Sequence, residues 1–258
     1  MRFEYVILVV AAFIGATFLI ISRSRAAGNS PPKDISTFDE QHRNLPKDAL
    51  NRRARSNAVM RAEGVPLNEW LPAIESEDEV KLPLSEKVAM RAAATLVVAL
   101  KGHGMSQERI EGLVRKYDLN DWFSPKELKF IRDSDPIERE REIQVWRYEA
   151  AKTLLWAVGF VEQLDGPRQL ADPKKLESIV LNQTRKQFVE SAKLRSKSEI
   201  LDQADLIYRY RWALVDARLH ERAAPAGLND DVAMERHQAL NWLIEEPETD
   251  WDDISLDT

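Results

Sequence analysis

The stretch S-K-S-E-I-L-D-Q-A-D-L-I-Y-R-Y-R-W-A-L-V-D-A-R, residues 196–218, decides the fold of this chain because it predicts one long, mostly buried helix. Ser196 and Glu199 form an S-x-x-E capping box, in which the serine oxygen accepts from one free backbone N–H and the glutamate accepts from another. No glycine or proline follows before Pro225, so nothing in the sequence ends the helix early.

A charged stripe runs along this predicted helix. Its four members fall within about 60° of one another at roughly 100° per residue: Asp202, Asp205, Arg209 and Asp216. Apolar residues flank the stripe or lie behind it: Leu201, Ile207, Tyr208, Trp212, Leu214 and Val215. A helix that is apolar nearly all round is usually buried, and an unpaired buried charge is strongly destabilising. The stripe is therefore expected to be paired within the fold.

The composition is that of one globular domain with an appendage: 258 residues, 44% hydrophobic and 31% charged. The absence of cysteine excludes disulfides, thiolate zinc sites and cysteine nucleophiles. Residues 22–62 hold nine basic and four acidic side chains, a net charge of +5. Arg2 and Glu4 cancel, so the total of −6 leaves −11 for residues 63–258. This acidic body argues against nucleic acid as a partner, because nucleic-acid binding needs a basic surface.

An uncharged run, Y-V-I-L-V-V-A-A-F-I-G-A-T-F-L-I-I, begins at Tyr5 and ends at Ile21 and predicts a membrane anchor. As a helix it would be roughly 26 Å long, the short end of a membrane span. The alternative is a cleaved signal peptide. Against that alternative, the run exceeds the usual length of about 7–15 apolar residues, and no small-residue cleavage site follows cleanly.

The charges that flank this run set its expected orientation. Arg2 stands alone before it, whereas three basic residues follow it: Arg23, Arg25 and Lys33. The positive-inside rule then places the N-terminus outside and the body in the cytoplasm. We therefore expect a single-pass protein of the inner, cytoplasmic membrane. The expected parts are an anchor with its basic flank at 1–25, a linker at 26–44 and a helical domain at 45–258.

Helix signals recur along the body and predict a single irregular multi-helix domain of the all-α class. S-P-K-E at 124–127 and D-P-I-E at 135–138 each combine a cap, a proline and a following glutamate. The second should open a long helix whose apolar part, 150–164, forms the centre of the core. No run alternates with period two over six residues, so no strand is expected. The remaining helices are expected at 45–63, 86–100, 106–117, from 173, at 186–195 and at 231–244, capped by Ser85, Ser106, Asp172 and Asn229 or Asp230 where a cap is evident.

Two charged segments precede the core. Four arginines lie along the first expected helix, at positions 52, 53, 55 and 61. A solvated helix face is the simpler interpretation, and contact with anionic lipid head groups is the alternative, at about 1 kcal/mol per basic residue. A short acidic loop follows at 75–79.

Several motifs resemble those of the bacterial proteins grouped as domain of unknown function 4272. The most specific are E-I-L-D followed by Y-R within 199–209, and E-R-H-Q-A-L-N-W at 235–242. Further pieces are A-E-G-V-P-L-N-E-W-L-P at 62–72, L-S-E-K-V-A-M-R-A at 84–92, W-R-Y-E-A at 146–150, L-L-W-A-V-G at 154–159, W-A-L-V-D-A-R at 212–218 and W-D-D-I-S-L-D-T at 251–258. The resemblance covers roughly residues 45–258 and leaves out the anchor. It implies a largely helical fold and no assigned activity, and it supplies no catalytic residues.

Known metal and cofactor signatures are absent from the sequence. No histidine follows a glutamate by three residues, and neither H-E-x-x-H nor a phosphate-loop, dinucleotide or G-x-S-x-G pattern occurs. Asp202 and Asp205 could share a cation, but an ion pair with Arg209 is the simpler use of such carboxylates. We therefore expect no metal and no cofactor.

The remaining candidate site is a polar cluster from the helices at 196–218 and 231–244. Its members are Asp202, Asp205, Tyr208, Arg209, Asp216, Arg218, Glu235, Arg236, His237 and Asn241. Three uses stay open: a buried ion-pair network, a pocket for a small polar ligand or a peptide, and catalysis with His237 or Glu235 as general base. The favoured function is a membrane-anchored interaction, scaffold or accessory protein with a protein partner. The alternative is an enzyme or small-ligand-binding protein, which an open pocket lined by the cluster would favour.

We predict that Ser30→Cys is not labelled by a membrane-impermeant thiol reagent in intact cells, because the segment after the anchor is expected to face the cytoplasm. The introduced thiol is a specific probe, since the chain has no cysteine of its own. Permeabilised cells serve as the positive control and must show labelling. Labelling of intact cells would contradict the predicted orientation.

Overall fold

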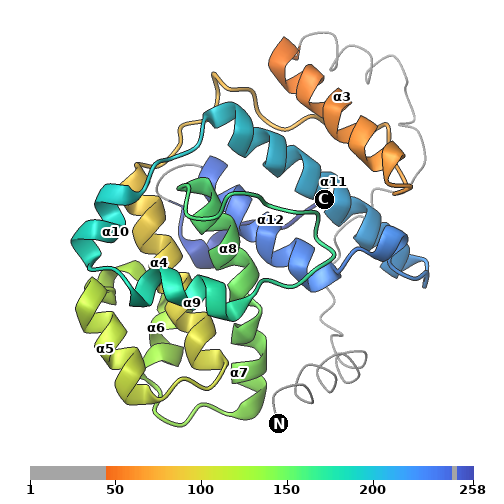
Figure 1. Ribbon diagram of the computed structural model, residues 1–258. Helices are drawn as coiled ribbons and strands as arrows, with labels where there is room; N and C mark the ends of the chain where they lie inside the picture. The colour runs from red at the N-terminus through yellow and green to blue at the C-terminus, as the bar shows by residue number, and fades with distance from the viewer. Residues whose placement is uncertain (1–44, 246–248) are drawn as a thin grey trace. The chain divides into compact units, whose positions relative to one another are not determined.

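Helices and their connecting loops make up the residues that the computed structural model describes, 45–245 and 249–258 (Figure 1). No strand occurs in these ranges, so the all-α prediction is confirmed. The anchor predicted at 5–21 lies outside them, and no helix within them is long and apolar enough to span a bilayer. The α-helices are α3 (Lys47–Ala62), α4 (Ser85–Gly102), α5 (Gln107–Tyr117), α6 (Pro125–Arg132), α7 (Glu138–Val145), α8 (Arg147–Ala157), α9 (Pro173–Leu181), α10 (Arg185–Ser191), α11 (Lys197–Leu219) and α12 (Asp230–Ile244). Short 3-10 helices are η1 (Asn120–Trp122), η2 (Pro225–Gly227) and η3 (Trp251–Asp253).

Helix α4 is the centre of the core. Its sequence carries small and branched apolar residues on every side, and each residue from 88 to 102 is buried. A helix of this kind is stable only where neighbours cover its whole circumference, and α5 to α10 all pack against it. The prediction that 150–164 forms the centre is correct only in part. The buried segment of that stretch is α8, which covers one side of α4 and ends at Ala157.

The other helices extend from α4 as a series. Helix α8 packs against both α4 and α12, α12 packs against α11, and α11 packs against α3. Figure 1 shows this series from α4 through α8, α12 and α11 to α3. The series brings together segments that are distant in the sequence: Arg55 of α3 pairs with Asp202 of α11, 147 positions later.

The long helix predicted to begin at Asp135-Pro136 and to include 150–164 is in fact two helices. Helix α7 ends at Val145, and Trp146 separates it from α8. The D-P-I-E signal was misleading, since Asp135 lies in a bend and α7 begins after Ile137, which is extended and offers no side-chain cap. After α8 the chain turns at Gly159, whose φ of +84° is a left-handed conformation that favours glycine.

Side-chain caps begin most of the other helices as predicted. Four expected caps accept a backbone N–H: Ser124, Asp172, Ser196 and Asn229. Thr184 adds a capping box at the start of α10 that was not predicted from the sequence, and α10 ends at Ser191 instead of 195. Ser85 and Ser106 make no cap hydrogen bond, and α4 begins at Ser85 itself and continues to Gly102.

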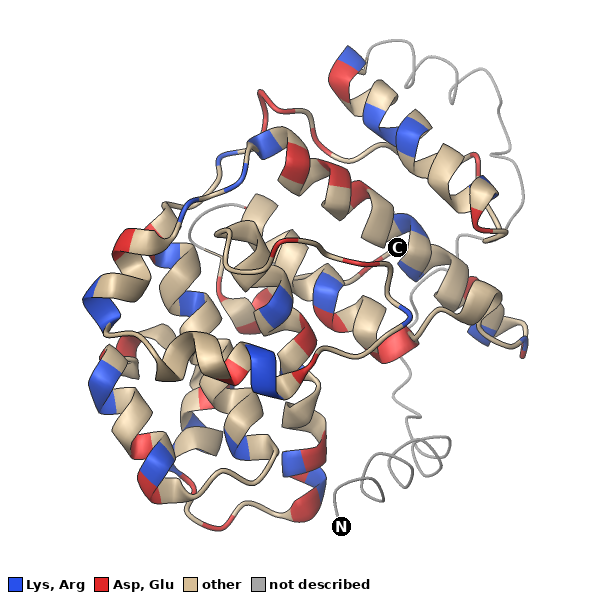
Figure 2. Ribbon diagram, viewed as in Figure 1, with Lys and Arg blue, Asp and Glu red and all other residues tan. Residues whose placement is uncertain are grey.

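The arginines of α3 bind to the domain itself. Each finds an acceptor within the chain: Arg52 at Asp48, Arg53 at the Glu69 carbonyl, Arg55 at Asp202 and Arg61 at the Glu69 carboxylate. Figure 2 shows acidic residues at the start of α3, in the connection between α3 and α4 and along α11, the segments that hold these acceptors. The pairing favours the interpretation of α3 as an ordinary solvated helix over that of a lipid-binding one.

The C-terminal tail, residues 249–258, is fastened to the body by Trp251 and Asp252. The buried Trp251 ring lies 4.4 Å from the Arg91 guanidinium. Asp252 accepts from the Ser124 hydroxyl at 2.9 Å and from the Lys126 N–H at 3.1 Å. This carboxylate therefore sits at the N-terminus of α6, where the helix dipole stabilises negative charge. Side chains of α12 donate to two backbone carbonyls of the tail, which holds it beside that helix.

We predict opposite effects of alanine at two helical glycines. A Cβ on Gly102 would lie 2.8 Å from the Arg141 carbonyl oxygen and 2.9 Å from the Val145 nitrogen, so α7 would have to move. Gly102→Ala should lower the free energy of unfolding by about 1–3 kcal/mol. A Cβ on Gly112 in α5 would have no atom within 4 Å. Gly112→Ala should therefore raise the free energy of unfolding by about 0.5–1 kcal/mol. Urea denaturation of the two variants measures both changes, and equal effects would contradict the close α4–α7 contact.

Candidate functional site

Asp205 and Arg209 form a buried ion pair on α11. Arg209 Nε and Nη2 donate to the two carboxylate oxygens of Asp205, each at 2.8 Å, and the side chains are 1% and 0% exposed for arginine and aspartate. The pair closes within one helical turn, as the spacing of four residues predicts. Arg209 Nη2 also donates to the Pro72 carbonyl at 3.0 Å. The pair therefore ties α11 to the loop that follows α3.

The other members of the predicted stripe lie apart from this pair. Each meets a different element: Asp202 pairs with Arg55 of α3, Asp216 pairs with Arg222 beyond the helix, and Arg218 pairs with Asp230 of α12. The Asp202 side chain is 39% exposed and that of Arg218 is 61% exposed, and Asp202 also lies 3.6 Å from the buried Arg52 of α3. The cluster is thus divided, because residues that share a helix face still reach different neighbours when the helix is 23 residues long.

Glu235 and Arg236 both face α8. Arg147 Nη1 donates to Glu235 at 3.1 Å, and Arg236 Nη2 donates to Glu149 at 3.0 Å. Burial raises the pKa of Glu235, and the Arg147 charge opposes that rise. The loop after α8 binds both members of the second pair, through the Asp165 carbonyl on Arg236 and the Ala171 N–H on Glu149. These residues therefore hold α12, α8 and that loop together.

A further buried pair, between Arg91 and Glu127, was not among the predicted site residues. Glu127 also accepts from the Ser124 N–H at 3.0 Å, as part of the α6 capping box. Arg91 Nη1 donates to the Trp122 carbonyl at 2.7 Å. The capping box was visible in the sequence and located Glu127 at the start of α6. Nothing in the sequence indicated that α4 would place an arginine beside it.

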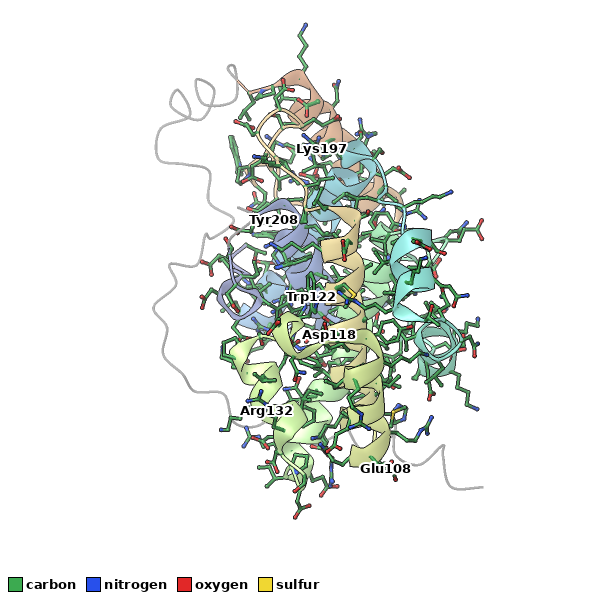
Figure 3. The ribbon with its side chains drawn as sticks, turned by 90° about the vertical axis from the view of Figure 1, so that its left-hand side faces the viewer. Glu108, Asp118, Trp122, Arg132, Lys197 and Tyr208 are labelled. Carbon is green, nitrogen blue, oxygen red and sulfur yellow. The ribbon has the colours of Figure 1, made fainter. Side chains whose placement is uncertain are left out.

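His237, Tyr208 and Asn241 line an open groove, and these are the members of the predicted cluster that border it. The groove has a volume of about 390 Å³ and lies between α11, α12, the loop after α3 and the C-terminal tail. Figure 3 shows Tyr208 toward the same end of the domain as Lys197, with Glu108 of α5 at the opposite end. The volume is within the range of small-ligand pockets, roughly 300–1,000 Å³.

His237 is a buried residue with an unused hydrogen-bonding atom. Its side chain is 1% exposed, and Nδ1 has no hydrogen-bond partner in the described ranges. Burial and, to a smaller extent, the Arg211 charge lower the pKa of His237 to about 3. The imidazole is therefore neutral near pH 7. An unsatisfied buried polar atom costs about 1–3 kcal/mol, so a ligand that offers a hydrogen bond here would stabilise the site.

The lining of the groove is acidic. Among the described residues it contains four carboxylates and no lysine or arginine: Glu75, Glu79, Glu245 and Asp257. Glu79 accepts from the backbone N–H and hydroxyl of Ser76 at 2.8 and 2.7 Å, which lowers its pKa. The carboxylates of Glu75, Glu245 and Asp257 make no hydrogen bond or ion pair with any described residue. The sequence showed the acidic loop at 75–79, but it did not show that this loop lies beside α12.

Other places for a ligand are poorer. No three His, Asp or Glu side chains between residues 45 and 245 or in 249–258 are grouped so that they could hold a metal ion. A smaller cavity of about 90 Å³ lies between α3, α11, α12 and residues 164–167. Its charged groups are already paired, since Glu63 binds Arg168 at 2.7 Å and Arg236 binds Glu149. The groove is therefore the better candidate site.

The fold and the site together define an α-helical domain with ion pairs in its core and an acidic groove beside α11 and α12. The chain belongs to the family described as Domain of unknown function (DUF4272), whose model matches residues 52–254. The match begins within α3 and includes every helix from α4 to α12, in agreement with the resemblance found in the sequence motifs. No curated protein and no solved structure matches the chain. The family description names no activity, so function has to be argued from the groove.

We predict that Arg209→Met lowers the free energy of unfolding by about 3–5 kcal/mol, because it leaves Asp205 charged and buried without its partner. The double variant Asp205→Leu with Arg209→Met should recover most of that loss, since it removes both charges. Glu190→Gln provides the control and should cost at most about 1 kcal/mol, because its ion pair with Lys186 is exposed. Chemical denaturation measures all three. A single Arg209→Met variant as stable as the parent would contradict a structural role for the pair.

Proposed function

We propose that this chain is an interaction protein that is tethered to the inner membrane by residues 5–21 and binds a partner in the acidic groove. The body then lies in the cytoplasm, where the groove meets its partner. The observation that carries the proposal is the groove itself, with the unsatisfied His237 in its wall and unpaired carboxylates around its mouth.

The distribution of the polar cluster supports a binding role for the groove and a structural role for the rest. Asp205, Arg209, Glu235 and Arg236 are engaged in buried pairs and have no charge left to offer a ligand. His237, Tyr208 and Asn241 instead border the groove, and Nδ1 of His237 has no hydrogen-bond partner among the described residues. Their mixture with the apolar Ile74, Val80 and Ile244 is typical of binding pockets, which combine apolar walls with a few polar groups.

Catalysis by the same residues is less well supported than binding. A general base works best when its pKa is close to the working pH. The pKa of His237, about 3, is too low for efficient proton abstraction at neutral pH. Glu235, the other candidate base, is buried and bound to Arg147. A groove that recognises a partner therefore agrees with the site better than an active site does.

An introduced thiol can test whether the groove is occupied in the cell, even while the partner is unidentified. Ala73→Cys places a thiol in the groove of a chain that has no other cysteine, and Glu138→Cys places one on the exposed face of α7 as a matched control. We expect the thiol of the Ala73→Cys variant to react with a small membrane-permeant maleimide several-fold more slowly in intact cells than in the purified chain. The control should react equally in both.

Equal reactivity of the groove thiol in cells and in the purified chain would mean that the groove is empty, and the proposal would fail. Because the reagent crosses membranes, this result does not depend on the orientation of the anchor.

A further inference from the structure

We infer that the groove takes a cationic peptide segment of a protein partner, one that carries several lysine or arginine side chains. This inference rests on the proposed binding function and names the chemistry of the ligand. It is carried by the charge of the groove lining, by the arrangement of its apolar residues and by the unsatisfied His237.

The charge of the lining has one sign. Glu75 and Glu79 come from the loop after α3, Glu245 follows α12, and Asp257 belongs to the C-terminal tail. Within the described part of the chain no lysine or arginine lines the groove, and three of the four carboxylates have no partner there. Such a surface attracts cations, and ammonium or guanidinium groups form strong charge-assisted hydrogen bonds with carboxylates. Because the carboxylates come from three separate segments, a ligand needs several cationic groups to bind all of them.

The apolar residues fit the stems of such side chains. Ile74, Val80 and Ile244 line the same groove as the carboxylates. Lysine and arginine bury their methylene stems against apolar surface and keep the charged end in a polar setting. The ring of Tyr208 adds an aromatic face, and a cation over such a face is stabilised further.

His237 is the independent indication that this groove is a binding site. Its side chain is almost completely buried, yet Nδ1 lacks a partner among the described residues, which is unusual for a buried polar atom. The neutral imidazole has one acceptor nitrogen and places no positive charge beside the carboxylates. A peptide that fills the groove brings N–H donors into this region.

The test measures binding of a fluorescent peptide of alternating lysine and alanine to the full chain in a non-ionic detergent. The groove variant combines Glu75→Gln, Glu245→Gln and Asp257→Asn. These three carboxylates make no bond to a described residue, so the melting temperature should stay unchanged. The control variant combines Glu138→Gln, Glu140→Gln and Glu142→Gln on exposed positions of α7, with the same change in net charge.

We expect the groove variant to bind the lysine peptide about tenfold more weakly than the parent, and the control variant to bind like the parent. Added salt should weaken binding to the parent, and a matched glutamate peptide should not bind. Equal weakening by the control variant would show attraction to the acidic body as a whole and would overturn the inference. Competition by spermidine as strong as that of the peptide would overturn the assignment to a peptide.

The two proposals can fail separately. If the lysine peptide does not bind while the thiol at position 73 remains protected in cells, the groove has a partner but the cationic class is wrong. If the peptide does not bind and the thiol is unprotected, the proposed binding function fails as well.

Discussion

Arginine charges inside the domain must be paired, and this constraint fixes how the helices fit together. Arg91, Arg209 and Arg236 are each at most 4% exposed, and each binds a buried carboxylate. Two of these pairs cross between helices, from α4 to α6 and from α12 to α8. A shift of either helix by one turn would separate the charges in a low-dielectric interior, where an unpaired ion is very unfavourable. The pairs therefore select one register among those that apolar packing alone would allow.

The acidic charge of the groove comes from residues outside these pairs. Each buried pair uses one arginine and one carboxylate, so the pairs of Arg147, Arg209 and Arg236 leave the balance of charge unchanged. The carboxylates around the groove lie on a loop, a helix end and the chain terminus, where solvent reaches them and no structural partner is required. Unpaired negative charge is therefore found at the groove, beside the aromatic and apolar residues of α11 and α12.

Local signals in the sequence predicted the helix starts well and the core less well. The capping boxes at Ser124 and Ser196 were correct because both partners lie within four residues of one another. The pattern at Asp135 was equally local, yet the chain stays extended through Ile137 and the helix starts later. The central position of α4 was missed, although residues 88–100 contain one charged side chain, Arg91, and residues 150–164 contain two, Lys152 and Glu162. Arg91 and Lys101 are nevertheless buried, because Glu127 pairs with Arg91 and backbone carbonyls accept hydrogen bonds from Lys101.

The sequence alone determined the all-α class, most helix starts and the Asp205–Arg209 pair, because these depend on interactions within about one helical turn. Only the tertiary structure divided the polar cluster into buried pairs and groove. Glu235 meets Arg147 across 88 positions and Arg236 meets Glu149 across 87. His237 follows these two residues directly, but its place in the groove depends on a loop far earlier in the chain and on the tail. Helical periodicity cannot predict contacts between residues so far apart in the sequence. They form only because α12 packs against α8 and α11.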